Sequence, residues 1–105
     1  MKEVTINLEK HGGPIYSGRE RGSSLREKLG LDELDKESAV IEIVVPEDTY
    51  TITSSFWLGL LSPSVKFFGT KEKFFDQYCV RLPDRFQGKF QYCVERALTQ
   101  QSGLI

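Results

Sequence analysis

Three hydroxyl residues in succession, Thr53, Ser54 and Ser55, stand at the start of an apolar stretch with helical spacing. One such side chain is explained by capping, because its oxygen accepts a hydrogen bond from a backbone N–H that the helix leaves unpaired. With three hydroxyl residues in a row, one or two hydroxyls are not needed for capping. They lie at a point where free N–H groups and the helix dipole favour an anion. The run therefore predicts either a helix cap alone or a cap that also receives a phosphate, as a ligand or on a serine.

The residues around this run suggest two further kinds of binding. Phe56 and Trp57 follow it directly. An outward-facing tryptophan would anchor a protein partner, whereas a helix buried on two sides would place it in the core, and the sequence leaves both open. Upstream, Arg19 and Arg21 are framed by glycines. If they fold back toward Thr53, the two features form one anion pocket for a small molecule or a nucleotide.

The sequence shows no pattern typical of a catalytic or metal site. His11 is the single histidine and lies in turn-forming sequence, so no serine or cysteine has a base placed beside it. Cys79 and Cys93 are far apart among apolar and aromatic neighbours, which predicts buried free thiols rather than metal ligands. We therefore expect a protein that is not an enzyme and that uses no metal and no cofactor.

Length and composition predict one ordinary globular domain that covers residues 1–105. A net charge of −1 provides no basic excess for phosphate contacts along DNA or RNA, so no nucleic acid is expected as a partner. The stretch 31–50 holds seven acidic residues, which predicts a solvated face or one that steers a protein partner. No signal peptide opens the chain and no apolar run reaches the ~20 residues of a membrane span. A cytoplasmic location without membrane association is expected.

Alternating and β-branched residues predict the strands. Residues 4–9 alternate between apolar and polar, residues 39–45 form an apolar run typical of a central strand covered on both faces, and residues 78–82 form another strand. Short extended pieces at 15–16 and 49–52 add to these. The predicted fold is α/β, with a mostly parallel sheet of four to five strands, crossover helices, and an N-terminal edge strand or hairpin.

Capping residues and glycines mark the predicted helices. Ser23 or Ser24 caps a helix that Gly30 ends, and the main helix begins just after Thr53 and ends at Gly69. Pro63 falls inside this main helix and predicts a kink or a restart. A further apolar stripe near the C-terminus predicts a closing helix.

The hydroxyl run and its surroundings resemble a known family. Residues 52–56, Ile-Thr-Ser-Ser-Phe, are followed by an apolar helix, then by Phe-Phe-Gly at 67–69 and a Lys/Glu/Phe turn. This order is similar to that of the STAS-like domains of unknown function related to anti-sigma-factor antagonists, in which a Ser-Ser-Phe turn opens the main helix. Tyr-Ser-Gly at 16–18 and Leu-Arg-Glu at 25–27 fit the same pattern, so the resemblance spans residues 14–98.

The resemblance implies a bacterial regulatory domain that binds a protein partner reversibly. Anti-sigma-factor antagonists carry an Asp-Ser-Ser-Gly type of turn, and a partner kinase phosphorylates its serine to switch binding off. Ser54 falls at the matching serine, with Thr53 in place of Asp and Phe56 in place of Gly. Ser54 and Ser55 are therefore candidate phosphorylation sites. Whether the partner is an ATPase, a kinase or a sigma-regulating protein is left open, as is the oligomeric state. The alternative function is binding of a small anion or nucleotide at the same helix N-terminus.

Overall fold

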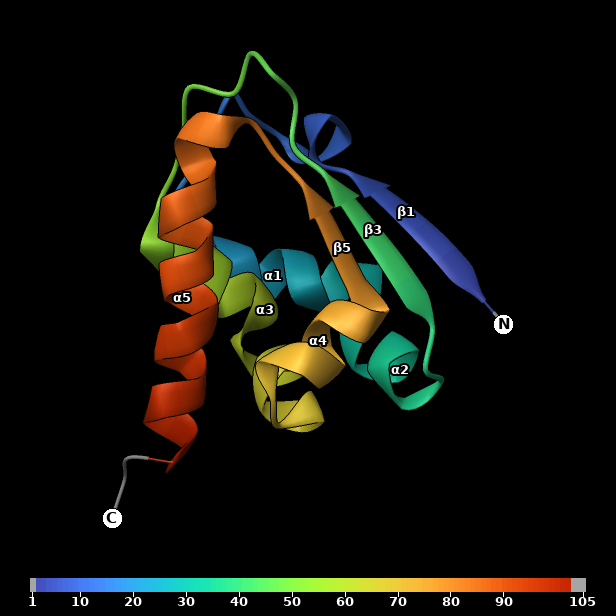
Figure 1. Ribbon diagram of the computed structural model, residues 1–105. Helices are drawn as coiled ribbons and strands as arrows, with labels where there is room; N and C mark the ends of the chain where they lie inside the picture. The colour runs from blue at the N-terminus through green and yellow to red at the C-terminus, as the bar shows by residue number, and fades with distance from the viewer. Residues whose placement is uncertain (1, 103–105) are drawn as a thin grey trace.

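The computed structural model describes residues 2–102, with side chains for residues 2–99. Its main sheet is parallel and consists of β1 (Glu3–Asn7), β3 (Val40–Val44) and β5 (Tyr78–Arg81), in the order β1-β3-β5 (Figure 1). The predicted N-terminal edge strand and the predicted central strand are thus both confirmed. The α/β class and the parallel pairing are confirmed with them.

A second, smaller sheet corrects the predicted topology. β2 (Ile15–Tyr16) pairs in parallel with β4 (Thr51–Ile52), apart from the main sheet. The single sheet of four to five strands is therefore wrong, and so is the N-terminal hairpin. The reason is the 3-10 helix η1 (Leu8–His11), which begins at once after β1 because the side chain of Asn7 accepts a hydrogen bond from the N–H of Glu9. This turn carries the chain away from β1 before β2 begins.

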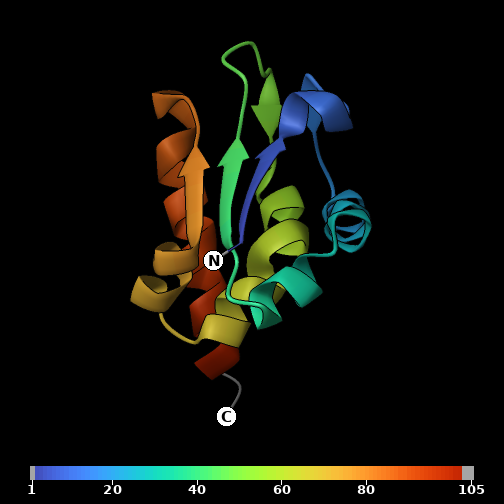
Figure 2. The ribbon, with the colours of Figure 1, turned by 90° about the vertical axis from the view of Figure 1, so that its right-hand side faces the viewer.

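The helices lie together on one face of the main sheet (Figures 1 and 2). They are α1 (Arg19–Leu29), α2 (Leu31–Lys36), α3 (Ser54–Phe68), α4 (Lys71–Gln77) and α5 (Asp84–Ser102). The central α3 packs between α1 and α5. The restart predicted at Pro63 does not occur, since α3 runs through the exposed proline as one helix. Within residues 2–102, no helix combines the length and hydropathy that crossing a bilayer requires.

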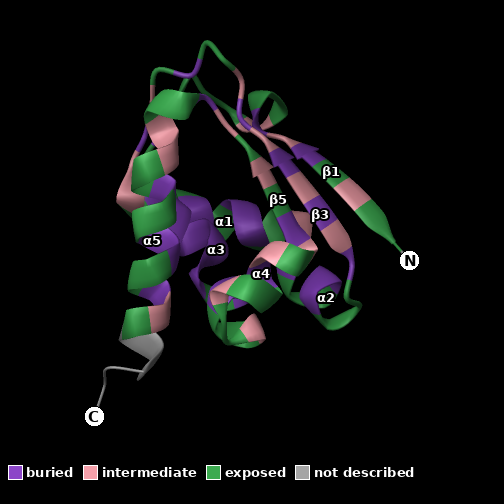
Figure 3. Cartoon of the chain, in the orientation of Figure 1, coloured by how far each residue is buried: buried purple, intermediate pink, exposed green. Residues whose placement is uncertain are grey.

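The opposite face of the main sheet is open. Ile41 and Ile43 are fully buried beneath the helices, whereas Glu42 between them is only half-buried. In the sheet register Glu42 lies between Thr5 of β1 and Cys79 of β5, which are both exposed (Figure 3). The prediction of a central strand covered on both faces is therefore wrong, and Cys79 is not the buried thiol that its apolar neighbours indicated.

Candidate functional site

Two strand-to-helix turns lie side by side at one end of the β2–β4 sheet. β2 continues through Ser17 and Gly18 into α1, and β4 continues through Thr53 into α3. Because β2 and β4 are parallel, both helices begin at the same end of the pair. The N–H of Gly18 donates to Oγ1 of Thr53 at 3.2 Å, and the N–H of Thr53 donates to the carbonyl of Tyr16 at 2.9 Å. We call residues 17–19 and 53–55 the paired turns.

Thr53 is the cap of α3, as predicted. Its Oγ1 also accepts a hydrogen bond from the N–H of Phe56 at 3.2 Å, so one hydroxyl serves a donor from each turn. The hydroxyls of Ser54 and Ser55 form no hydrogen bond with the described side chains or backbone. Ser54 is half-buried, and its carbonyl accepts from Sγ of Cys93 at 3.9 Å, whereas Ser55 is exposed. Ser55 therefore offers the more accessible free hydroxyl.

The two arginines are separated by the start of α1. The glycine-framed segment was predicted to precede the helix, but it forms the first helical turn, and Arg19 is the first helical residue. Its exposed side chain belongs to the paired turns. Arg21 instead donates through Nη1 to the carbonyl of Ile15 at 2.6 Å and lies 5.4 Å from the ring centre of Tyr16. Arg21 is thus held against β2, whereas Arg19 lies in the paired turns.

Phe56 and Trp57 lie in the core. Both are fully buried, Phe56 against the ring of Tyr16 and Trp57 edge-on to Phe90 at 4.9 Å between ring centres. The structure thus favours the core interpretation of Trp57 over the partner anchor. Its Nε1 has no hydrogen-bond partner among the described residues.

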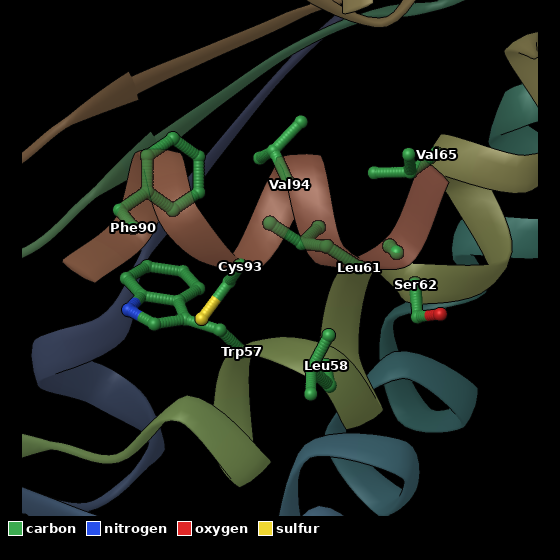
Figure 4. Close-up of a pocket in the computed structure, with 9 residues that line it drawn as sticks. Trp57, Leu58, Leu61, Ser62, Val65, Phe90, Cys93 and Val94 are labelled. Atoms are coloured by element: carbon green, nitrogen blue, oxygen red, sulfur yellow. The ribbon is translucent and has the colours of Figure 1, made fainter. Parts of the chain in front are cut away.

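A small gap beside Trp57 separates α3 from α5 (Figure 4). Its volume of about 10 Å³ is at the lower limit for one water molecule, so it holds no organic ligand. Cys93 lines the gap and is buried as predicted. Burial raises the pKa of its thiol, which keeps the sulfur protonated and unreactive at neutral pH.

Two helical glycines bring the paired turns together. A methyl group added to Gly59 of α3 would overlap the carbonyl oxygen of Arg19, and one added to Gly22 of α1 would overlap that of Phe56. The backbones of α1 and α3 therefore touch without an intervening side chain. This contact sets the two helix N-termini next to each other. The only sequence signal for it was the placement of glycine inside helical patterns.

Two exposed apolar side chains lie at the start of the β2–β4 pair, at the end opposite the paired turns. Ile15 is 46% exposed and Tyr50 is 76% exposed, and Ile15 pairs in the β2–β4 register with Thr51, the neighbour of Tyr50. Aromatic and aliphatic side chains of this kind are common in protein interfaces. Their exposure could not be predicted, because strands of two residues are too short for a period-two pattern to distinguish a buried face from an exposed one.

Protein-family models, curated proteins and solved structures give no match to this chain. The likeness to STAS-like domains remains a resemblance of short motifs. Function is therefore argued from the residues of this chain.

A wider pocket lies near the ends of β1 and β3 and differs chemically from the paired turns. Its volume is about 290 Å³, and it is lined by Glu9, Gly12, Gly13, Pro14, Tyr16, Pro46, Asp48 and Thr49. The two carboxylates give its rim negative charge, and burial raises the pKa of the Tyr16 hydroxyl, which keeps it neutral. The guanidinium of Arg21 lies over the ring of Tyr16, so the lining of this pocket meets charges of both signs.

A buried cluster of polar side chains joins four elements, and its members form their hydrogen bonds within the protein. The carboxylate of Asp35 in α2 accepts from Oγ of Ser64 at 2.5 Å, from the hydroxyl of Tyr78 at 2.6 Å and from Nη2 of Arg26 at 3.1 Å. Nη1 of Arg26 also donates to the carbonyl of Leu60 at 2.9 Å. Burial, and then the hydrogen bond to Asp35, raise the pKa of Tyr78, so its hydroxyl remains protonated. We interpret this cluster as structural.

Metal ligands do not gather anywhere in the described part of the chain. Within it, no three histidine, cysteine, aspartate or glutamate side chains lie close enough together to hold a metal ion.

Proposed function

We propose that this domain acts without catalysis, by reversible association with a protein partner through the paired turns, and that a phosphate on Ser55 or Ser54 weakens that association. The observation that carries the proposal is the adjacency of two helix N-termini, joined by the Gly18–Thr53 hydrogen bond, with the free hydroxyl of Ser55 exposed beside them. The resemblance to anti-sigma-factor antagonists supports a regulatory role of a bacterial type.

A phosphate at this place would leave the domain folded. It adds nearly two negative charges, and the unpaired N–H groups of two helix N-termini stabilise such charge. The exposed side chain of Arg19 adds a nearby positive charge.

The same phosphate would oppose binding. A partner that extends from the paired turns along the short β2–β4 pair to Ile15 and Tyr50 must remove water from the turns. Desolvation of a doubly charged phosphate carries a large free-energy penalty unless the partner supplies matching charge. Ser55 is exposed whereas Ser54 is half-buried, so a kinase reaches Ser55 more readily. We therefore place the main modification one residue after the serine that the family pattern indicates.

Ser55→Glu is expected to weaken partner binding at least tenfold, about 1.4 kcal/mol, because it places negative charge in the interface. Ser55→Ala should bind as the wild type does. The measurement is calorimetric titration against the ATPase, kinase or sigma-regulating proteins encoded beside the gene. Ser24→Glu, an exposed position further along α1, provides the control for added charge. Equal affinities for Ser55→Glu and Ser24→Glu would contradict the role of the paired turns.

Anion binding is the second candidate function, and the exposed Arg19 at the start of α1 is the observation that favours it. If the paired turns hold an anion, titration with inorganic phosphate or a nucleotide should shift the backbone amide resonances of Gly18 and Ser55 saturably. Arg19→Gln should weaken these shifts, whereas Lys28→Gln on the same helix should not. An unresponsive spectrum up to millimolar phosphate would leave protein association as the function.

A further inference from the structure

The outer edge of β1 is unpaired among the residues that the structure describes. The strand order β1-β3-β5 places it at the edge of the main sheet (Figure 2). The carbonyl of Lys2 accepts from the N–H of Val40 in β3 at 2.9 Å, so Lys2 directs its backbone groups toward β3. Because these groups alternate in direction along a strand, Glu3, Thr5 and Asn7 direct theirs outward. Three residues therefore offer N–H and C=O groups to a further strand.

This edge lacks the features that usually keep edge strands from pairing. Natural edges are blunted by lysine or proline within the strand, by a bulge, or by a covering segment. β1 contains neither lysine nor proline, and its pairing with β3 runs without a bulge from Glu3 to Asn7. Its central residues Val4, Thr5 and Ile6 are β-branched, which favours extended pairing.

We propose that β1 pairs with β1 of a second copy of this chain, antiparallel and about a two-fold axis at Thr5. In this register Thr5 lies opposite Thr5 of the other copy, and each Glu3 lies opposite Asn7, a carboxylate beside an amide that can donate to it. Val4 lies opposite Ile6 on the helix-covered face, where both are apolar. The two main sheets become one continuous sheet, with the helices of both copies on the same face.

Other antiparallel registers are less favourable. An axis at Glu3 places two carboxylates opposite each other. An axis at Val4 places the ammonium of Lys2 opposite Ile6, on the face that the helices cover. An axis at Ile6 requires Val4 to pair with Leu8, which already belongs to η1. Only the axis at Thr5 pairs every residue of the strand. Its two-fold symmetry also closes the assembly at two copies instead of extending it.

The size of the contact sets its strength. A five-residue strand spans about 17 Å and its pairing supplies about six backbone hydrogen bonds, less than a standard stable interface provides. The dimer is therefore concentration-dependent and dissociates on dilution. It uses residues 3–7, whereas the proposed partner surface uses the paired turns, so the two proposals succeed or fail separately.

Thr5→Pro tests the edge directly. It removes an outward N–H and no hydrogen bond to β3, and proline is tolerated in an edge strand at such a position. In sedimentation velocity experiments, the wild type and Thr5→Val should show a weight-average mass that rises toward twice that of the monomer as concentration increases. Thr5→Pro should associate at least tenfold more weakly while its circular dichroism spectrum remains that of the wild type. A wild type that stays monomeric at the highest attainable concentration, or a Thr5→Pro variant that associates equally, overturns the proposal.

Cross-linking tests the register without relying on proline. In a Cys79→Ser background, Thr5→Cys places two thiols opposite each other, with about 5.5 Å between their Cα atoms, within the range for a disulfide. Glu3→Cys places the two thiols four residues out of register and serves as the matched control. Copper-catalysed air oxidation should give covalent dimers for Thr5→Cys and few for Glu3→Cys. Equal yields, or none at position 5, contradict the axis at Thr5.

Discussion

Asp35→Ala is expected to lower the free energy of unfolding by about 3–5 kcal/mol, as is typical when one partner of a buried ion pair is removed. Asp35 is fully buried and receives hydrogen bonds from Arg26, Ser64 and Tyr78. Without the carboxylate, a buried guanidinium loses its buried counter-charge and two hydroxyls lose their acceptor. Because the cluster joins α1, α2, α3 and β5, we expect the whole domain to unfold in one transition at lower urea concentration.

The matched control is Asp32→Ala, one helical turn earlier. Asp32 also bonds to Arg26, through Nη2 and Nε, but its side chain is 72% exposed. Solvent screens that pair, so its loss should lower the free energy of unfolding by less than about 1 kcal/mol. Urea denaturation followed by circular dichroism measures both. The double variant Arg26→Met, Asp35→Leu should recover part of the stability, because it leaves no unpaired buried charge. Equal effects of the two aspartate substitutions would mean that the buried cluster is not the stabilising feature.

The sequence predicted best the longer helices and strands, in which apolar and polar residues follow one consistent pattern over several positions. The start of α3 at Thr53 followed from a hydroxyl before an apolar stripe, and its end followed from Gly69, which adopts the left-handed conformation. β1 and β3 followed from alternation and β-branching. In each case local chemistry and tertiary burial favour the same conformation.

Features that depend on distant residues could not be predicted. The extended pieces at 15–16 and 49–52 were predicted and contain β2 and β4, but two residues in each strand give no pattern that indicates their mutual pairing. Asp35 was counted within an acidic stretch and interpreted as part of a charged face. Its burial depends on Arg26 and Tyr78, and a single sequence does not indicate which carboxylate meets a buried cation.

The position of the candidate site in the chain was predicted, but the residues that form it differ in part from those predicted. The hydroxyl run was placed at a helix start, and Thr53 is the cap. One alternative had the glycine-framed arginine segment fold back toward this turn, but the segment was interpreted as a loop, whereas it forms the first turn of α1. Of the two predicted arginines, Arg19 lies in the paired turns beside Gly18, whereas Arg21 bonds to the carbonyl of Ile15. Phe56 and Trp57 contribute to the core rather than to the surface, so the turn is held rigidly while its hydroxyls remain accessible.

Gly59→Ala is expected to lower the free energy of unfolding by about 2–3 kcal/mol, in the range for overpacking of a close contact. Its methyl group would overlap backbone atoms of Arg19, and backbone cannot rotate away as a flexible side chain can. Helix α1 must therefore move away from α3. Gly88→Ala in α5 is the control, because open space surrounds that position. Alanine is the better helix former, so Gly88→Ala should raise stability by up to about 1 kcal/mol.

The same substitution links stability to the proposed function. A shift of α1 lengthens the Gly18–Thr53 hydrogen bond and separates the two helix N-termini, so Gly59→Ala should weaken partner binding even at temperatures where the domain remains folded. Thermal unfolding and calorimetric titration on the same samples separate the two effects, and Asp35→Ala provides a destabilised reference whose paired turns are intact. If both variants bind equally well under conditions where they are folded, then binding does not require the close contact of α1 and α3, and the partner surface lies elsewhere.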